Sequence, residues 1–343
     1  MRHWSRDQIS RVLGALLRPF YGGLGCVLCL HRIVPKDDRS ANAENRALEI
    51  TPGALRAILD WVRRRGLEVI RLDEVRARLA SPRGPKFIVF TFDDGYRDNM
   101  TEALPIFRDF GMPFTMNVTT GFIERTTSLW WYALEDAMAG RAALKFEWEG
   151  APQDYSLETP EDRMHTFAEL SWLIRQQGLA TRDELVARIC AAGGIDPLAR
   201  TRELMLTWDE LKKMAGDWHV NIGSHTVGHH NLNKLTDDEV KAELLDARTL
   251  LEAKLERPVR HLAYPFGGRN AVGRREFDLA RIADFTTATT TRCSNLFHEH
   301  AWHLQALPRL GLSGNYPALL RLRKMECGLV PAKENEWQRI VVE

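Results

Sequence analysis

The sequence predicts an α/β fold in which parallel strands are joined by helical crossovers and form a (β/α) barrel. Strand-like and helix-like segments alternate from Gly25 onward, which is typical of parallel strands with helical connections. Acidic and histidine residues follow the ends of two strand-like segments, and such barrels gather their chemistry at the carboxyl ends of their strands. We therefore expect one catalytic centre at that end of the barrel.

The first part of the chain supplies four expected strands. Each is a short apolar run, whereas the intervening segments carry helix signals such as Thr51-Pro52 at a start and Gly66 at an end. We expect strands at Gly25–Val34, Leu67–Leu72, Lys86–Phe92 and Pro113–Thr119, and helices at 52–65, 73–80 and 97–109.

The alternation stops between residues 123 and 205 and then resumes. This middle segment is rich in Trp and Glu and is helical where patterned, as over Pro160–Gln177 and Thr181–Ala192. We expect a large helical insertion at the rim of the barrel, where substrate selection usually resides. Beyond it we expect a capped helix start at Thr207, a helix at 236–256 with a Thr-x-x-Glu capping box, and strands at His219–Gly223, Arg260–Tyr264 and Asp284–Thr290.

Composition limits the classes of function. The chain has 343 residues, of which 47 are Lys or Arg and 46 are Asp or Glu, so its net charge is +1. This balance argues against nucleic acid as a partner, because binding nucleic acid needs a concentrated basic face. The five cysteines are odd in number and widely spaced, unlike a secreted disulfide framework, and Cys26 and Cys29 are interpreted as small buried hydrophobic residues.

Residues 1–24 form an N-terminal segment ahead of the single barrel domain expected over 25–343. We expect a short amphipathic helix at 6–21, whose apolar side chains are Leu13, Leu16, Leu17 and Phe20. Arg18-Pro19 interrupts the apolar run after six residues, whereas a signal peptide needs about 7 to 15. The protein is therefore expected to be cytoplasmic. The helix either packs on the protein's own core or makes a peripheral contact with the inner face of the cytoplasmic membrane, which would bring the catalytic face near a lipid-linked saccharide.

Two segments contain the residue types of a metal centre. Asp93 and Asp94 follow an apolar strand, and a turn beginning at Gly95 would let both carboxylates serve one site. His225 and His229 follow another strand and, being four residues apart, can share a face of a helical turn. One Asp with two His is the ligand pattern of an open catalytic metal site, which leaves the other Asp free to act as a base.

These residues resemble the polysaccharide deacetylases of the NodB-homology type, a group within carbohydrate esterase family 4. The Thr-Phe-Asp-Asp-Gly stretch at 91–95 matches the first motif, His225 to His229 matches the second, and Pro265-Phe266-Gly267 is similar to the third. Each motif alone is weak, but all three occur in the family's order at strand ends. The resemblance covers roughly Gly25 to Arg309 apart from the middle segment, and it implies a distorted or incomplete (β/α) barrel.

The resemblance also implies roles for the charged residues. Asp94, His225 and His229 would bind a divalent metal ion, with Zn²⁺ most expected and Co²⁺, Ni²⁺ or Fe²⁺ as alternatives. Asp93 would be the general base. A bound divalent ion lowers the pKa of its water toward ~7 and polarises an amide carbonyl, so a neighbouring carboxylate can take the proton of that water.

The substrate side of the site follows from the same resemblance. The backbone N–H of Tyr96 would stabilise the oxyanion, and Tyr264, Pro265 and Phe266 would line one wall of the groove. Many members of the family carry an Arg that steadies the base, but the aligned residue here is Ala263. We expect Arg309, in Leu307-Pro308-Arg309, to substitute for it.

Two histidines compete for the role of the acid that protonates the leaving amine. His298 fits the family's usual Leu-x-His spelling, but its surroundings are polar and His-rich, like a surface loop. His31 ends an apolar strand and resembles the Tyr-His-Arg-[Val/Ile] stretch of the exopolysaccharide deacetylase branch, in which the first strand supplies the acid. We favour His31 because of its place at a strand end.

The sequence therefore predicts a metal-dependent hydrolase that removes an N-acetyl group from a glycan or from a lipid-linked saccharide intermediate in cell-surface polysaccharide biosynthesis. Three further interpretations stay open: a deformylase or other amidohydrolase using the same site, a two-His-one-carboxylate iron oxygenase, and a non-catalytic glycan-binding descendant. Trp130 and Trp131 are equally interpretable as a sugar-stacking surface or as an anchor for the insertion.

Overall fold

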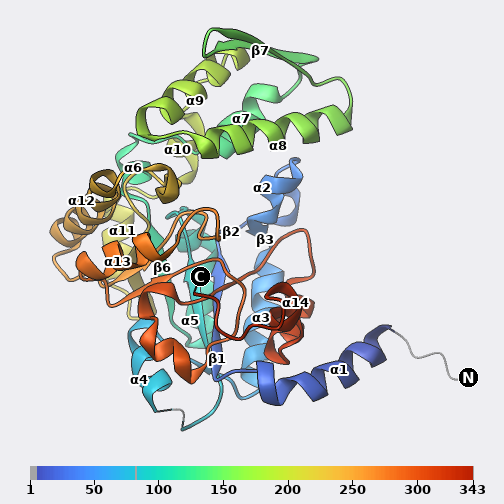
Figure 1. The fold of residues 1–343 in the computed structure, drawn as a ribbon, viewed down its shortest axis with the longest axis vertical. Helices are drawn as coiled ribbons and strands as arrows, with labels where there is room; N and C mark the ends of the chain where they lie inside the picture. The colour runs from blue at the N-terminus through green and yellow to red at the C-terminus, as the bar shows by residue number, and fades with distance from the viewer. Residues whose placement is uncertain (1–5, 82, 343) are drawn as a thin grey trace, which may run out of the picture.

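A parallel β-sheet forms the centre of the molecule (Figure 1). The computed structural model describes residues 6–81 and 83–342. Within these residues, seven strands follow one another in the order β11-β10-β9-β6-β5-β1-β12, and β4 also pairs with β5. The strands of this sheet are β1 (Gly25–Leu30), β4 (Glu68–Val69), β5 (Phe87–Phe92), β6 (Phe114–Val118), β9 (Val220–Ser224), β10 (His261–Ala263), β11 (Thr287–Thr289) and β12 (Leu310–Gly311). Their pairings are all parallel, which confirms the predicted α/β fold with an incomplete barrel.

The central strands are buried along their whole length. Every residue of β1 (Gly-Cys-Val-Leu-Cys-Leu) and of β5 (Phe-Ile-Val-Phe-Thr-Phe) is buried. Continuous apolar runs of this kind are typical of parallel strands whose two faces are both covered. Cys26 and Cys29 lie in this core as free thiols, in agreement with their interpretation as buried hydrophobic residues.

The segment from residue 307 to residue 311 bridges the two ends of the sheet. Leu307 forms a parallel bridge with Thr289 of β11, and Leu310 pairs with Leu28 of β1. Arg309 lies between these two contacts and is fully buried. The segment that contains β12 thereby places the guanidinium of Arg309 inside the barrel.

Helices cover the sheet in the alternating order that the sequence predicts. The capped helix start expected at Thr207 and the capping box expected at Thr236 are both formed, and each is a capping box, with Glu210 and Glu239 as partners. The α-helices are α1 (Arg6–Tyr21), α2 (Ala43–Ala47), α3 (Pro52–Arg64), α4 (Val75–Ala80), α5 (Leu104–Phe110), α6 (Thr120–Glu124), α7 (Trp130–Met138), α8 (Pro160–Gln176), α9 (Leu179–Gly193), α10 (Ala199–Leu204), α11 (Trp208–Ala215), α12 (Asp237–Leu255), α13 (Arg274–Ile282), α14 (Ala318–Glu326) and α15 (Leu329–Glu334).

The insertion between β6 and β9 stands above the carboxyl end of the sheet, at the top of Figure 1. Helices α7, α8 and α9 pack around a hydrophobic core of their own, which includes Trp130, Trp131 and Phe167. The insertion also contains an antiparallel hairpin of β7 (Ala143–Trp148) and β8 (Ala151–Ser156). The sequence pattern of this segment, which indicates helices alone, does not reveal the hairpin.

Several expected strands are shorter than predicted, such as Leu67–Leu72, of which only Glu68–Val69 is a strand, and two expected elements also change in form. The strand expected over Gly25–Val34 is interrupted at His31, after which β2 (Arg32–Ile33) leaves the main sheet and pairs with β3 (Glu49–Ile50). The helix expected at 97–109 begins with a π-helical turn, η3 (Asn99–Ala103), before α5. The interruption at His31 releases that residue from the sheet at its carboxyl end.

Helix α1 occupies the opposite end of the molecule from the insertion (Figure 1). It packs on α15, and Gly14 lies so close to Cys327 that a Cβ there would contact the sulfur at 2.8 Å. Leu16 and Phe20 are exposed, whereas the side chain of Leu13 lies outside the described part of the structure. Among the described residues, no helix is long and apolar enough to cross a membrane.

Candidate metal and catalytic site

The two adjacent carboxylates lie where β5 ends. Asp93 continues the strand direction, and Asp94 adopts a left-handed conformation with φ of 75°, followed by Gly95 at 94°. The turn therefore begins at Asp94, one residue earlier than the sequence suggested. Both carboxylates are buried and face one cavity, because this turn reverses the alternation that a continuing strand would impose.

The two histidines of the second motif lie on an irregular loop after β9. The expectation that they share a face of a helical turn is wrong, because Thr226 and His229 have φ values of 69° and 53°, which a right-handed helical turn excludes. The left-handed conformation at His229 brings its ring back beside His225, with the ring centroids 4.9 Å apart.

Buried charges on two other elements hold this loop in its strained conformation. Glu243 of α12 accepts hydrogen bonds from the amides of Val227 and Gly228 at 3.0 and 2.8 Å. Arg182 of α9 donates to the carbonyl of Gly228 at 2.6 Å. Glu243 and Arg182 carry no motif signal in the sequence, because only the folded chain shows that they reach the loop.

Asp94, His225 and His229 have the geometry of a metal-binding set. Oδ1 of Asp94 lies 3.4 Å from Nε2 of each histidine, and the three ligand atoms lie within 4.8 Å of one another. Nδ1 of His225 lies 2.7 Å from the carbonyl oxygen of Ala263, so Nδ1 carries the proton and Nε2 presents its lone pair. The buried Oδ1 of Asp94 has no hydrogen-bond partner among the described residues. One carboxylate and two imidazoles fit a divalent ion with an open position for water.

Asp93 is held by Arg309, the residue expected from the sequence to replace the missing arginine. Nη1 and Nη2 of Arg309 donate to the two carboxylate oxygens at 2.8 and 2.7 Å. Asn117 of β6 donates a further hydrogen bond to Asp93 at 2.8 Å, a contact that no sequence motif indicates. A bidentate contact fixes the carboxylate plane as well as its charge.

The two carboxylates differ in how readily they ionise. Burial acts to raise the pKa of Asp93, but the Arg309 guanidinium and His225 outweigh it, so the pKa of Asp93 lies well below its usual range. Burial and the neighbouring charge of Asp93 raise the pKa of Asp94 well above its usual range. Asp93 is therefore ionised at neutral pH, whereas burial and the charge of Asp93 disfavour the ionised form of Asp94, which a cation beside it would stabilise.

His31 lies in the same cavity, close to Asp93. A side-chain donor atom of His31 lies within 4.8 Å of one from Asp93 and one from Cys29. The side chain of Asn99 donates a hydrogen bond to the backbone carbonyl of His31 at 2.8 Å. Burial lowers the pKa of His31 to about 4, with Asp93 opposing this shift. His31 is therefore neutral at pH 7 and has to receive a proton before it can donate one.

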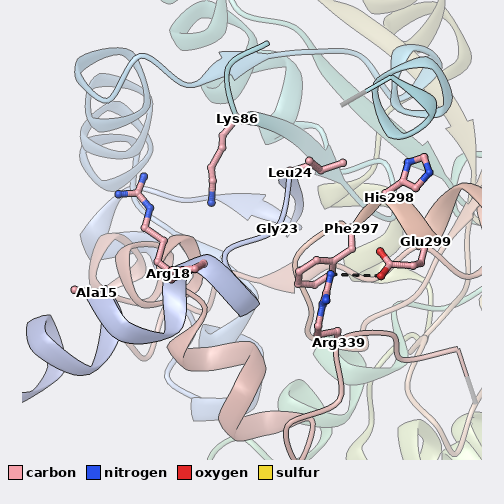
Figure 2. Close-up of a pocket in the computed structure, with 10 residues that line it drawn as sticks. Ala15, Arg18, Gly23, Leu24, Lys86, Phe297, His298, Glu299 and Arg339 are labelled. Carbon is pink, nitrogen blue, oxygen red and sulfur yellow. Dashed lines mark hydrogen bonds and ion pairs between the residues drawn. The ribbon is translucent and has the colours of Figure 1, made fainter. Parts of the chain in front are cut away.

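His298 lies far from this cavity. It lines a pocket at the amino end of the strands, together with Arg18 of α1 and Lys86, which directly precedes β5 (Figure 2). Its Nδ1 lies 2.5 Å from the carbonyl oxygen of Leu79. The Leu-x-His spelling therefore occurs here at the wrong end of the barrel for catalysis.

The four residues expected on the substrate side lie around the same centre. Tyr96 is buried, and its hydroxyl accepts a hydrogen bond from Nε1 of Trp131 at 3.1 Å. Tyr264 and Phe266 line the cavity on either side of Pro265, and the Phe266 ring packs edge-on against His229 at 4.9 Å. Their roles toward a substrate stay predictions.

A cavity of about 250 Å³ connects these groups. Trp130 and Trp131 line it, yet both are buried in the core of the insertion, and Trp131 packs against His229 with ring centroids 5.2 Å apart. These contacts favour the anchoring interpretation of the two tryptophans, because their rings already pack on the protein. The residues that line the cavity are His31, Glu44, Asn45, Leu48, Asp93, Asp94, Trp130, Trp131, Phe167, Arg175, His225, His229, Tyr264, Phe266 and Thr291.

Replacing His31 with glutamine is expected to lower kcat by about 10²-fold or more, the usual scale of general acid catalysis. The matched control is His298→Ala, for which kcat should change little because His298 lies at the other end of the barrel. Initial rates of acetate release measure both variants. An inactive His298 variant beside an active His31 variant would reverse the assignment.

Replacing Arg309 with methionine is expected to shift the acidic limb of the kcat/KM pH profile to higher pH. Loss of the guanidinium raises the pKa of Asp93, so this carboxylate, the expected base, becomes protonated at a higher pH. The free energy of unfolding should fall by about 3–5 kcal/mol at neutral pH, because a buried charge loses its partner.

The loss in free energy of unfolding caused by Arg309→Met should be larger at neutral than at acidic pH. Asp93 has a lower pKa in the folded than in the unfolded protein, so its stabilisation is present above the ordinary pKa of 3.8 and fades as pH falls below it. Denaturant unfolding at pH 7 and pH 3 measures this difference. The control for the kcat/KM profile is Arg309→Lys, which keeps the charge and should shift the acidic limb less than Arg309→Met does. Equal profiles for the wild type and both variants would contradict the role of Arg309 in positioning Asp93.

Comparisons with known proteins were made for the whole chain. The family model described as polysaccharide deacetylase matches residues 80–279, which is more than half of the chain. The poly-beta-1,6-N-acetyl-D-glucosamine N-deacetylase of Escherichia coli (strain K12) is 21% identical over 328 residues, which cover 87% of this chain and 38% of that protein. This chain thus spans well under half the length of the curated relatives that it matches.

Solved structures share the fold at low sequence identity. The Streptococcus pyogenes deacetylase PplD in complex with acetate aligns with a TM-score of 0.56 and 19% identity, covering 88% of this chain and 97% of that chain. IcaB from Ammonifex degensii aligns with a TM-score of 0.54 and 17% identity, covering 88% and 97%. Both likenesses extend well beyond the three motifs to most of the chain.

Proposed function

Because the chain belongs to the polysaccharide deacetylase family, we propose that it removes the N-acetyl group from a glycan, or from a lipid-linked saccharide intermediate, in the biosynthesis of a cell-surface polysaccharide. Family membership makes the protein a carbon–nitrogen hydrolase. The observation that most directly supports the proposal is that Asp94, His225 and His229 converge on one point beside Asp93, which is ionised and fixed by Arg309.

Each residue of the site has a defined task in this reaction. Asp94, His225 and His229 would hold a divalent ion, which would polarise the amide carbonyl of the substrate and lower the pKa of a bound water. Asp93 accepts the proton of the attacking water, since Arg309 keeps its carboxylate ionised and oriented. His31, within a few ångströms of Asp93, receives that proton and passes it to the leaving amine. The Tyr96 amide is the proposed donor to the oxyanion.

Mass spectrometry of incubated saccharides tests the proposal. The metal-loaded protein should convert an N-acetylated saccharide into a product about 42 mass units lighter, and the Asp93→Asn variant should not. A loss of about 28 mass units from N-formylated saccharides alone would favour a deformylase, which would use the same residues. No loss from any N-acylated saccharide, with metal bound and the fold intact, would overturn the proposal.

An iron oxygenase and a non-catalytic glycan-binding protein are both less well supported by the site. An iron oxygenase would need no second carboxylate beside the ligands, yet Asp93 is buried there with its own arginine and asparagine partners. A non-catalytic descendant would have no need to keep both the base and the three ligands, all of which are in place around one cavity.

The cytoplasmic location and the membrane contact through residues 6–21 stay proposals, and one of their expected consequences is wrong. Leu16 and Phe20 are exposed on α1, which supports a contact with an apolar surface. However, α1 lies at the amino end of the strands, whereas the metal-binding residues lie at the carboxyl end (Figure 1). A contact through α1 would therefore hold the catalytic face away from the membrane surface.

A further inference from the structure

The cavity of the metal site contains a cation that the proposed chemistry does not use. Arg175, at the end of α8, lines this cavity, with its guanidinium 5.5 Å from the ring centre of Trp130 and 5.3 Å from that of Phe266. Phe266 in turn packs on His229. Burial lowers the pKa of Arg175 because it disfavours the charged guanidinium, whereas the charge of Glu44 raises that pKa, so Arg175 and Glu44 attract each other. Among the described residues, however, they do not form an ion pair. An anion bound beside Arg175 would stabilise its charge.

A second cavity of about 460 Å³ adjoins the first, and we call it the apolar groove. The two cavities share Phe167 and Glu44. The apolar groove continues toward the start of α8, where Met164 and Pro160 line it together with Met138 of α7. Along α8, Arg175 therefore lies at the metal site, Phe167 at the junction of the two cavities, and Met164 in the groove. An α-helix rises about 1.5 Å per residue, so the three side chains follow one another along the helix axis.

Four polar side chains line the apolar groove: Asn42 and Glu135 are engaged in hydrogen bonds, whereas Glu44 and Arg163 are exposed. Glu135 accepts hydrogen bonds from Ser40 at 2.7 Å and from Asn45 at 2.6 Å. The side chain of Asn42 caps α2 by accepting from the amides of Glu44 and Asn45. Besides the exposed Glu44 and Arg163, a run of sugar hydroxyls would meet mainly apolar surface and would lose hydration there, whereas an aliphatic chain needs no polar partner.

From these observations we propose that Arg175 and the apolar groove form a subsite for an amphiphilic substrate, in which an acidic group contacts Arg175 and an aliphatic chain follows the groove past Phe167 and Met164. The inference rests on the proposed function, since the N-acetylated sugar of the same substrate occupies the metal site. The acidic group is a phosphodiester or a carboxylate, because either oxyanion matches the planar guanidinium.

Binding of four soluble ligands to the zinc-loaded protein tests the subsite. The ligands are N-acetylglucosamine carrying at C1 a methyl group, an octyl group, a methyl phosphodiester or an octyl phosphodiester, measured by isothermal titration calorimetry below micellar concentrations. The octyl phosphodiester should bind at least about tenfold more tightly than either ligand with one feature, because ion pairing and methylene burial each contribute. The octyl glycoside of a disaccharide containing a uronic acid then distinguishes a carboxylate from a phosphodiester.

Variants assign the two features to their residues. Arg175→Gln should remove the preference for the phosphodiester, and Arg175→Lys should retain part of it. Met164→Glu, at an exposed position in the groove, should remove the preference for the octyl chain. Matched controls are Arg188→Gln on α9 and Trp172→Glu, an exposed apolar residue of α8 that does not line the groove. Both controls should keep the wild-type order of affinities.

The results separate the subsite from the proposed function. Equal affinities for the four ligands, or preferences that persist in Arg175→Gln and Met164→Glu, would overturn the subsite even if acetate is released. A phosphodiester preference that survives Arg175→Gln would place the phosphate on the metal ion instead. Conversely, the predicted order of affinities without release of acetate from any of the ligands would support the subsite and count against deacetylation of this sugar.

Discussion

An Asp93→Asn variant is expected to keep one metal ion per chain and to lose at least about 10²-fold in kcat. Asparagine has the shape of aspartate but no basic oxygen of comparable strength, so the attacking water keeps its proton. We expect the metal to be retained because the proposed ligands, Asp94, His225 and His229, do not include Asp93. Metal analysis of the purified variant, together with its rate of acetate release, measures both parts of the prediction.

This variant also leaves the Arg309 cation without its carboxylate, so a fall in stability is expected alongside the loss of activity. The thermal melting temperature has to be recorded, and rates compared at a temperature where both proteins are folded. A folded, metal-loaded Asp93→Asn protein with wild-type turnover would rule out Asp93 as the base.

Replacing any of Asp94, His225 or His229 with alanine is expected to reduce bound metal to a small fraction of one equivalent and to abolish turnover. Each is one of the three proposed ligands, and the two that remain would hold a divalent ion weakly. The matched control is His230→Gln. His230 is the neighbouring histidine, but its Nδ1 lies 3.3 Å from Glu243 and, among the described residues, it belongs to no ligand set.

Metal content by mass spectrometry and metal affinity by competition with a chelator measure these variants. Stoichiometric metal in the His225 variant would remove it from the ligand set. Loss of metal in the His230 variant, with its fold intact, would show that the neighbouring histidine contributes to binding.

The sequence predicts the sheet and the position of the chemistry because both depend on local patterns. Buried apolar runs mark β1 and β5, and polar residues directly after strands mark the carboxyl end of the barrel. The substitution of Arg309 for the missing arginine was also predictable, since an ionised buried Asp93 needs a cation.

Features that depend on distant contacts could not be predicted in the same way. The loop that carries His225 and His229 looks helical by spacing, but hydrogen bonds from its amides to Glu243 and from Arg182 to its carbonyl hold it in a left-handed conformation. The residues that supply these contacts lie on α12 and α9. Similarly, His298 matches a motif by spelling alone, and only the fold shows that it lies at the amino end of the strands.

Titration of the metal-free protein with Zn²⁺, with acetate release from an N-acetylated saccharide as the readout, tests the central claim most directly. The claim is that Asp94, His225 and His229 hold one catalytic ion beside the base Asp93. The rate should rise in proportion to added metal and break at one equivalent, and the Asp93→Asn variant should bind the same equivalent without gaining activity. Full turnover by the metal-free protein, or a folded protein that binds one equivalent at this site and leaves every N-acylated saccharide intact, would contradict the account.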